Sequence, residues 1–185
     1  IDISPLQRLA SRDMVAESMI LAGEAAARFA AQKDLPFPFS TQPTPDPEMV
    51  ISALTHPAGP AADFARRRCQ RPGRVSGDPQ PHAGLGLELY ARVTSPLRRY
   101  LDLVAHQQLR AALGRGVLMD APTILERVGA ADAVAGGVRS GEADARRHWT
   151  LVYLQQRAPW QGEGVLIAVR GRRGLVLVPE IALEA

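Results

Sequence analysis

The sequence predicts an α+β fold that is mostly helical and ends in a β-hairpin. Apolar residues recur at three- and four-residue steps through most of the chain, and β-rich runs follow Pro159. With 185 residues, of which 46% are hydrophobic, the chain is long and apolar enough for about one domain with a buried core. Because no apolar run approaches the roughly 20 residues that span a bilayer, we predict neither a membrane span nor a membrane partner.

The first helix is predicted from Ser11 to Ala31, where Ser11 can cap the helix start. Its apolar stripe comprises Val15, Met19, Ala22, Ala26, Phe29 and Ala30. A proline-rich stretch from Leu35 to Pro47 follows, and its missing amides exclude a helix interior or a central strand.

Shorter elements follow the prolines. Asp46 and Pro47 are typical of a helix cap and a first helical residue, which predicts a short helix through about Leu54. A second short helix is predicted from Ala61 to Cys69. The proline- and glycine-rich segment from Gln70 to Gly86 is expected to form an ordered but irregular loop.

The strongest helical pattern begins at Ser95-Pro96 and ends before Gly114, a residue suited to a left-handed helix terminator. Its stripe comprises Leu97, Tyr100, Leu101, Val104, Leu109 and Leu113. Two further helices are predicted, at Pro122 to Ala135 and Ser140 to Gln156, with Gly136-Gly137 as the break between them.

The last part of the chain has the pattern of a β-hairpin. The runs from Val165 to Val169 and from Leu175 to Val178 are rich in β-branched residues and leucine. The segment from Arg170 to Gly174 joins them and contains two glycines, which favours a tight turn.

Charge and cysteine content narrow the class of protein. All but one of the 22 basic residues are arginine, Lys33 being the exception, and the formal net charge is +3. The planar guanidinium fork suits phosphate, so a nucleic-acid partner is a reasonable hypothesis, although biased codon usage explains the arginines equally well. The single cysteine, Cys69, permits no internal disulfide and favours a cytoplasmic location.

The most specific candidate site lies where the strongest helix begins. In a helix starting at Ser95, Arg98 and Arg99 would occupy the first turn, where unpaired amides make the local field positive. Free amides, the hydroxyls of Thr94 and Ser95 and the two guanidinium groups could converge there on a phosphate. The alternative is that Arg98 pairs with Asp102 and that Arg99 is solvated.

Other charged groups carry weaker hypotheses. Five arginines fall within nine residues, and such a patch either binds phosphates without reading sequence or is a solvated surface. They are Arg66, Arg67, Arg68, Arg71 and Arg74. Asp13 and Glu17 could share a cation or complement the helix dipole. Asp102 could orient His106, although a histidine on a helix face is more often structural. The four histidines show no metal-ligand spacing.

Two segments closely resemble the C-terminal signature of the ribonuclease II and ribonuclease R (RNB) family. They are residues 82–90, HAGLGLELY, and 93–106, VTSPLRRYLDLVAH. The segment of residues 15–24 is similar to a family segment with two adjacent acids and a terminal Ala-Asn-Glu, but Ala16 and Gly23 depart from that pattern. Ser40 stands where an arginine is common in the family.

The resemblance implies hydrolytic degradation of single-stranded RNA from the 3′ end to nucleoside monophosphates. It implies that Arg98 is the catalytic arginine that clamps the scissile phosphate and that Glu17 contacts the terminal nucleotide. Further RNA-binding candidates are Tyr90, in the family-like segment, and, from the local chemistry, Thr94, Ser95, Arg99, Arg66 and Arg68. The resemblance further implies that residues 1–157 are the C-terminal half of an RNB-type catalytic domain and that residues 158–185 are the incomplete start of an OB-type RNA-binding barrel.

The family uses magnesium held by clustered aspartates, which the resemblance assigns to an upstream half of the domain; Asp2 stands alone here. We therefore expect no metal ligand in this chain, expect the upstream half of the same protein as a partner, and expect the segment alone to be inactive. Two alternatives remain: a non-catalytic RNA-binding member of the same fold, and a helical interaction scaffold whose arginines are solvated.

Overall fold

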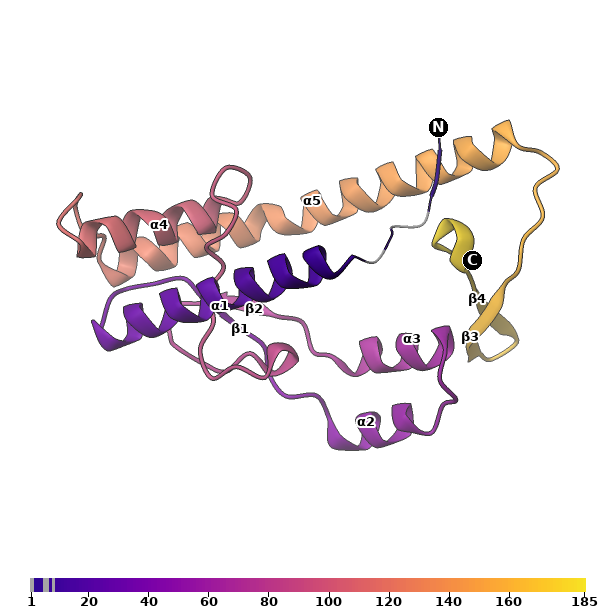
Figure 1. The fold of residues 1–185 in the computed structure, drawn as a ribbon, viewed down its shortest axis with the longest axis horizontal. Coiled ribbons are helices and arrows are strands. Elements are labelled where there is room, and N and C mark those ends of the chain that lie inside the picture. The colour runs from indigo at the N-terminus through magenta and orange to yellow at the C-terminus, as the bar shows by residue number, and fades with distance from the viewer. Residues whose placement is uncertain (1, 5–6, 8) are drawn as a thin grey trace. The chain divides into compact units, whose positions relative to one another are not determined.

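The computed structural model describes residues 2–4, 7 and 9–185, and Figure 1 traces the chain. Its contacts divide the chain into two units, each built from separated segments. The first unit comprises Arg8–Thr44 and Arg71–Ala135. The second unit comprises Ile1–Gln7, Pro45–Gln70 and Gly136–Ala185. The domain boundary expected at residues 157/158 remains a prediction.

The first unit is helical, with one small sheet. It contains helix α1 (Ala10–Gln32), helix α4 (Tyr100–Ala112) and the beginning of helix α5 (Ala121–Gln156). Strands β1 (Phe39–Thr41) and β2 (Arg74–Ser76) pair antiparallel, with Ser40 opposite Val75 (Figure 1). A short 3-10 helix, Ala83–Leu85, precedes the loop that leads into α4.

Two apolar clusters hold the first unit together. One joins α1, β1 and α4 to the loop before α4 through Ala27, Ala30, Phe37, Phe39, Ala91, Val93 and Ala105. The other joins α4 to α5 through Leu101, Val104, Ile124 and Val128. The fully buried Gln108 lies in the same region, where its side-chain amide donates to Pro36 O (2.7 Å) and Met119 O (3.0 Å) and its carbonyl accepts from Met119 N (2.9 Å).

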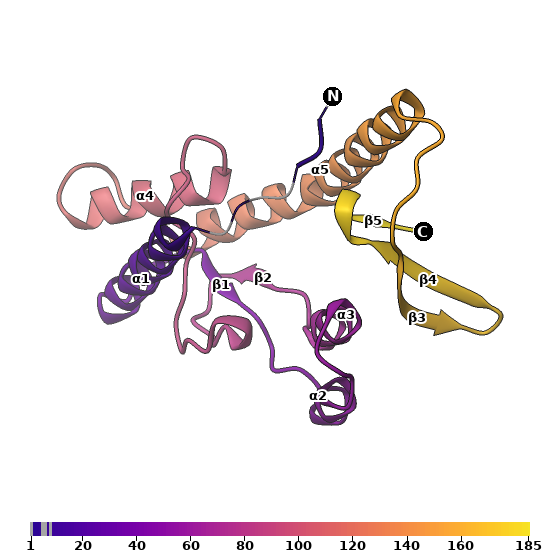
Figure 2. The same cartoon turned by 45° about the vertical axis from the view of Figure 1, so that its right-hand side comes forward.

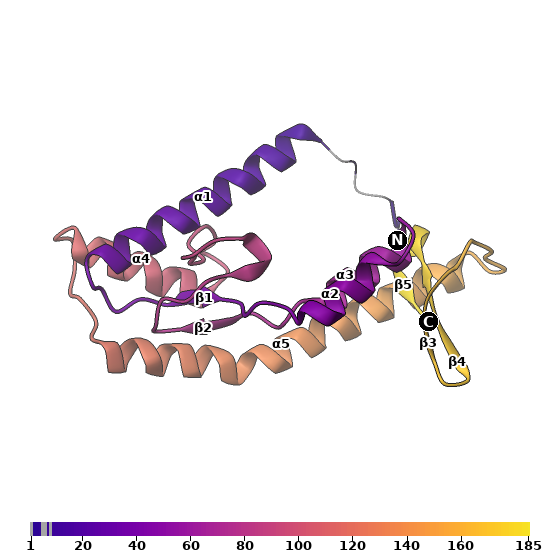
Figure 3. The same ribbon diagram turned by 90° about the horizontal axis from the view of Figure 1, so that it is seen from below.

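The second unit combines two short helices with a hairpin. Helices α2 (Pro47–Leu54) and α3 (Pro60–Cys69) pack against each other (Figure 2). Strands β3 (Val165–Arg170), β4 (Arg173–Val178) and β5 (Leu183–Glu184) form an antiparallel sheet in that order, and α3 contacts β3. Figure 3 shows the tight turn of the β3–β4 hairpin, where Gly171 adopts φ +59°.

Most of the predicted elements are confirmed. The α+β class, α1, α2, α3 and the terminal hairpin all form, and Asp46 caps α2 by accepting from Glu48 N at 2.9 Å. The predicted cap of α1 is wrong, because the N-cap residue is Leu9 and makes no side-chain cap. The left-handed terminator of α4 is confirmed, since Gly114 has φ +75°.

Three predictions are corrected. The segment from Ala121 to Gln156 is one continuous helix that includes Gly136 and Gly137, because a glycine inside a helix costs only about 1 kcal/mol relative to alanine and does not by itself end the helix (Figure 1). The loop predicted from Gln70 to Gly86 contains β2, which pairs with a strand more than 30 residues earlier. Helix α4 begins at Tyr100 rather than Ser95.

No helix among the described residues is both long enough and apolar enough to cross a membrane.

Candidate phosphate-binding site

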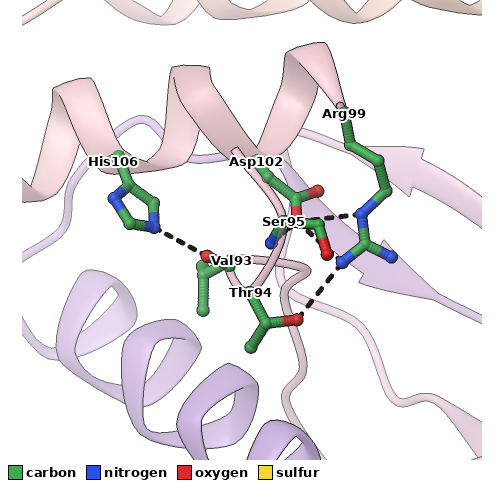
Figure 4. Close-up of polar contacts among 6 residues, drawn as sticks. All are labelled: Val93, Thr94, Ser95, Arg99, Asp102 and His106. Atoms are coloured by element: carbon green, nitrogen blue, oxygen red, sulfur yellow. Dashed lines mark hydrogen bonds and ion pairs between the residues drawn. The ribbon is translucent and has the colours of Figure 1, made fainter. Parts of the chain in front are cut away.

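The candidate site is the loop that enters α4, together with the buried carboxylate of Asp102 in the first turn of that helix (Figure 4). The side chain of Asp102 is 1% exposed. Its Oδ2 accepts from Ser95 N at 2.9 Å and from Arg99 Nε at 2.9 Å, and lies 2.8 Å from an Arg99 terminal nitrogen. One buried oxygen therefore joins the two ends of the segment from Ser95 to Arg99.

The segment itself is a tight turn. Ser95 O accepts from Arg98 N at 3.2 Å and from Arg99 N at 3.0 Å, and Pro96 occupies the second turn position, where its fixed φ is favourable. Arg99 is extended, with φ −121° and ψ 114°, so the turn cannot continue into α4. The same guanidinium that meets Asp102 also donates to Thr94 Oγ1 at 3.2 Å.

These contacts correct the predicted site in two ways. The amide of Ser95 is not free, because it donates to Asp102, and the helix consequently starts five residues later than predicted. The alternative pairing of Arg98 with Asp102 is also wrong, because Arg99 is the arginine that reaches the carboxylate. The sequence did contain a signal for this contact: Asp102 is the only acid among residues 93–106.

Arg98 differs from its neighbour in exposure and in contacts. Arg98 is exposed, whereas the side chain of Arg99 is 27% exposed and ion-paired. Within the described part of the chain, no hydrogen bond or ion pair engages the guanidinium of Arg98. Leu97, beside it on the turn, is fully exposed. The turn thus presents one unneutralised guanidinium to its surroundings.

The other candidates in the first unit lie around this loop or on α1. Thr94 and Ser95 are half-buried in the loop, and Glu17 is exposed on α1. Tyr90 is half-buried, and its ring packs edge-to-face on His82 with centroids 5.5 Å apart. Their roles toward RNA remain predictions.

The two histidines of this region have different environments. His106 Nε2 lies 2.6 Å from Val93 O, and Asp102 is engaged with Ser95 and Arg99, so His106 makes a structural contact with the loop and is not oriented by Asp102. Burial of the ring lowers the pKa of His82 below its usual value, and the positive charge of Arg92 lowers it further. His82 is therefore neutral near pH 7.

The arginine-rich segment is divided between the units. Arg66, Arg67 and Arg68 lie on α3 in the second unit, whereas Arg71 and Arg74 belong to the first. Arg66 forms an exposed ion pair with Asp63 at 3.4 Å. The guanidinium of Arg68 lies over the Phe64 ring, 5.8 Å from its centroid.

The acids and histidines of the chain do not assemble a metal site in the described residues. No group of three or more His, Cys, Asp or Glu side chains there could hold a metal ion. Asp2 instead lies 2.8 Å from Arg157. The residues described thus do not fit a magnesium centre.

The RNB domain model matches residues 1–115, more than half of the chain, so the chain belongs to the RNB domain family. An uncharacterized ribonuclease of Synechocystis is 37% identical over 182 residues, covering 94% of this chain and 27% of that protein. The chloroplastic/mitochondrial ribonuclease II of Arabidopsis thaliana is 29% identical, covering 93% of this chain and 22% of that protein. The chain spans about a quarter of the length of these relatives.

Solved structures share the fold. Mycoplasma genitalium RNase R in complex with ribose methylated single-stranded RNA matches with a TM-score of 0.73 at 18% identity, covering 97% of this chain and 34% of that one. An active-site mutant of the Dss1 exoribonuclease from Candida glabrata matches with a TM-score of 0.76 at 23% identity, covering 90% of this chain and 22% of that one.

Proposed function

We propose that this chain is part of a 3′→5′ hydrolytic exoribonuclease that degrades single-stranded RNA to nucleoside monophosphates, and that it supplies a phosphate clamp. The observation that carries the proposal is the exposed guanidinium of Arg98, which has no partner among the described residues and sits on a turn tied to a buried carboxylate. Membership of the RNB domain family and relatives named ribonuclease support the reaction class.

The chemistry follows from where charge develops during phosphodiester hydrolysis. As water attacks, negative charge accumulates on the non-bridging oxygens of the scissile phosphate. A guanidinium presented on a fixed turn donates two parallel hydrogen bonds to such oxygens and needs little reorganisation when the charge appears. Arg98 is the catalytic residue in this proposal, and the hydroxyls of Thr94 and Ser95 border its turn.

Magnesium and its aspartate ligands belong, in this proposal, to an upstream half of the same protein, where the ion would activate the attacking water. The chain alone is then inactive toward RNA. Glu17 and Tyr90 contribute contacts to the nucleotides, and Arg66 and Arg68 add contacts to phosphates. Cys69, the single cysteine, is an unpaired buried thiol, which suits an enzyme that works in the cytoplasm.

The decisive experiment is Arg98→Ala in a protein that joins this chain to its upstream half. Loss of one preorganised electrostatic donor is expected to lower kcat on single-stranded RNA by about 10²-fold or more. Arg115→Ala is the matched control, since Arg115 is also exposed and lies in the same unit. A loss below threefold for Arg98→Ala would remove the clamp from the mechanism.

The upstream sequence separates the enzyme from a non-catalytic RNA-binding member of the fold. Clustered aspartates there, together with magnesium-dependent release of monophosphates, are the result expected for the enzyme. RNA binding with no release of monophosphates would favour the non-catalytic alternative. Filter binding of a short single-stranded RNA at two salt concentrations tests the scaffold alternative, which requires no measurable affinity.

A further inference from the structure

The contacts of Asp102 are unusual for a residue in the first turn of a helix. An aspartate there commonly serves the exposed amides of its own helix or the helix dipole. Asp102 instead contacts the loop seven residues earlier, where its Oδ2 accepts two hydrogen bonds, from Ser95 N and Arg99 Nε, and forms an ion pair with Arg99 (Figure 4). Its Oδ1 is buried and has no hydrogen-bond partner among the described residues.

Burying a carboxylate in this way is costly. A buried charge is tolerated only when it is paired and hydrogen-bonded, and an unsatisfied buried oxygen adds to the penalty. An apolar residue at position 102 would avoid that cost, because the neighbouring Leu101, Val104 and Ala105 already pack into the apolar clusters. The carboxylate is therefore better explained by what it holds than by its contribution to the stability of the unit.

What Asp102 holds is the turn that carries Arg98. It fixes the amide of Ser95 at the start of the turn and the guanidinium of Arg99 just after its end. Arg99 in turn reaches the hydroxyl of Thr94, so the loop is tied at both ends around Arg98. The Arg98 side chain makes none of these contacts and remains exposed.

We propose that Asp102 is a positioning residue for the phosphate clamp, acting through the Ser95 amide and the Arg99 guanidinium to fix the turn that presents Arg98. This proposal rests on the function proposed above. It divides the adjacent arginines between two tasks: Arg98 contacts the phosphate, and Arg99 holds the turn instead of contacting RNA. Displacement of a catalytic group by about 1 Å costs up to 10²-fold in rate, so a looser turn is sufficient to impair turnover.

The test is a double-mutant cycle of Asp102→Asn with Arg98→Ala in the protein joined to its upstream half. Asp102→Asn keeps the shape of the side chain and one acceptor but removes the charge that holds Arg99. We expect kcat to fall about tenfold or more, with KM for single-stranded RNA changed less than threefold. In the Arg98→Ala background, Asp102→Asn should change kcat less than twofold, because a positioning residue has no effect once its target is absent.

Two further variants keep the test decisive. Asp120→Asn is the matched control, since Asp120 also accepts a backbone amide, that of Thr123 at 2.9 Å, in the same unit and near a helix start. It should leave kcat unchanged. If Asp102→Asn does not fold, as judged by circular dichroism, Arg99→Gln replaces it, because it removes the partner of Asp102 from a partly exposed position. The same kcat loss and the same non-additivity are expected.

The outcomes separate this proposal from the function on which it rests. If Arg98→Ala lowers kcat 10²-fold while folded Asp102→Asn and Arg99→Gln retain more than half of wild-type kcat, the clamp stands and the positioning role is overturned. If the kcat losses of Asp102→Asn and Arg98→Ala multiply in the double mutant, Asp102 has a general structural role, and the positioning role is also overturned. If Arg98→Ala itself has no effect on kcat, the proposed function fails first.

Discussion

Gly23 offers a stringent test of how the loop before α4 packs, because α1 and that loop meet at this residue. Ala91 N donates to Gly23 O at 3.3 Å, and a Cβ on residue 23 would lie 2.5 Å from Ala91 O and closer still to the Tyr90 ring. The Tyr90 ring can move, but the Ala91 carbonyl belongs to the backbone and is two residues from the buried Val93. Gly23→Ala therefore forces the loop away from α1.

The magnitude follows from two opposing terms. In a helix interior, Gly→Ala stabilises by up to about 1 kcal/mol through the lower entropy of the unfolded chain. Forcing an extra methyl group into a packed site costs about 1–3 kcal/mol, and contact with backbone at such a distance favours the upper end of that range. We expect Gly23→Ala to lower the free energy of unfolding by about 1–2 kcal/mol.

Gly129 on α5 is the matched control, since it lies in a helix of the same unit and a Cβ there would meet nothing within 4 Å. Gly129→Ala should raise the free energy of unfolding by up to about 1 kcal/mol. Urea denaturation followed by far-ultraviolet circular dichroism measures both variants under identical conditions. If Gly23→Ala proves as stable as Gly129→Ala, the close approach of α1 and the loop is refuted.

Three other predictions test separate contacts. Gln108→Leu should lower the free energy of unfolding by at least about 2 kcal/mol, because Pro36 O and both backbone polar groups of Met119 lose their partner in a buried site. Urea denaturation measures this loss, and a change within about 0.5 kcal/mol would contradict the prediction. Because the pKa of His82 is lowered in the folded protein by burial, the unfolded chain binds more protons, and stability falls as pH drops below about 6.5. His82→Phe should shrink the loss of unfolding free energy between pH 7.5 and pH 5.5, and an unchanged loss would argue against the buried ring. Arg66→Ala should weaken RNA binding modestly and reduce the slope of log affinity against log salt by about 0.7, whatever the RNA sequence, whereas an unchanged slope would make α3 a solvated surface.

Local pattern was enough for elements whose boundaries are set by neighbouring residues. The spacing of apolar residues predicts α1, and the Asp46-Pro47 pair predicts the start of α2, because each signal acts within one or two helical turns. The hairpin is predictable for the same reason, since its turn and both strands are contiguous. Strands β1 and β2 were missed because three-residue strands carry little pattern and their pairing joins distant segments.

The candidate site shows where such reasoning fails. The apolar stripe from Leu97 to Leu113 predicts a helix that begins at Ser95. Helix α4 instead begins at Tyr100, because the Ser95 amide donates to Asp102 and Arg99 is extended. Sequence patterns indicate which face of a helix is apolar, but they do not indicate which of two adjacent arginines will pair with a buried carboxylate. The family resemblance points to Arg98 by its place in the motif, and the contacts add that Arg99, not Arg98, pairs with Asp102.

The different contacts of Arg98 and Arg99 determine how charge is distributed at this site. Two adjacent guanidinium groups near a helix start repel each other and oppose the helix dipole, so a site with both free would hold its cations poorly in place. Asp102 neutralises Arg99 and lies in the first turn of α4, where a negative charge is favourable. Arg98 is then left as the one guanidinium of the turn without a partner among the described residues.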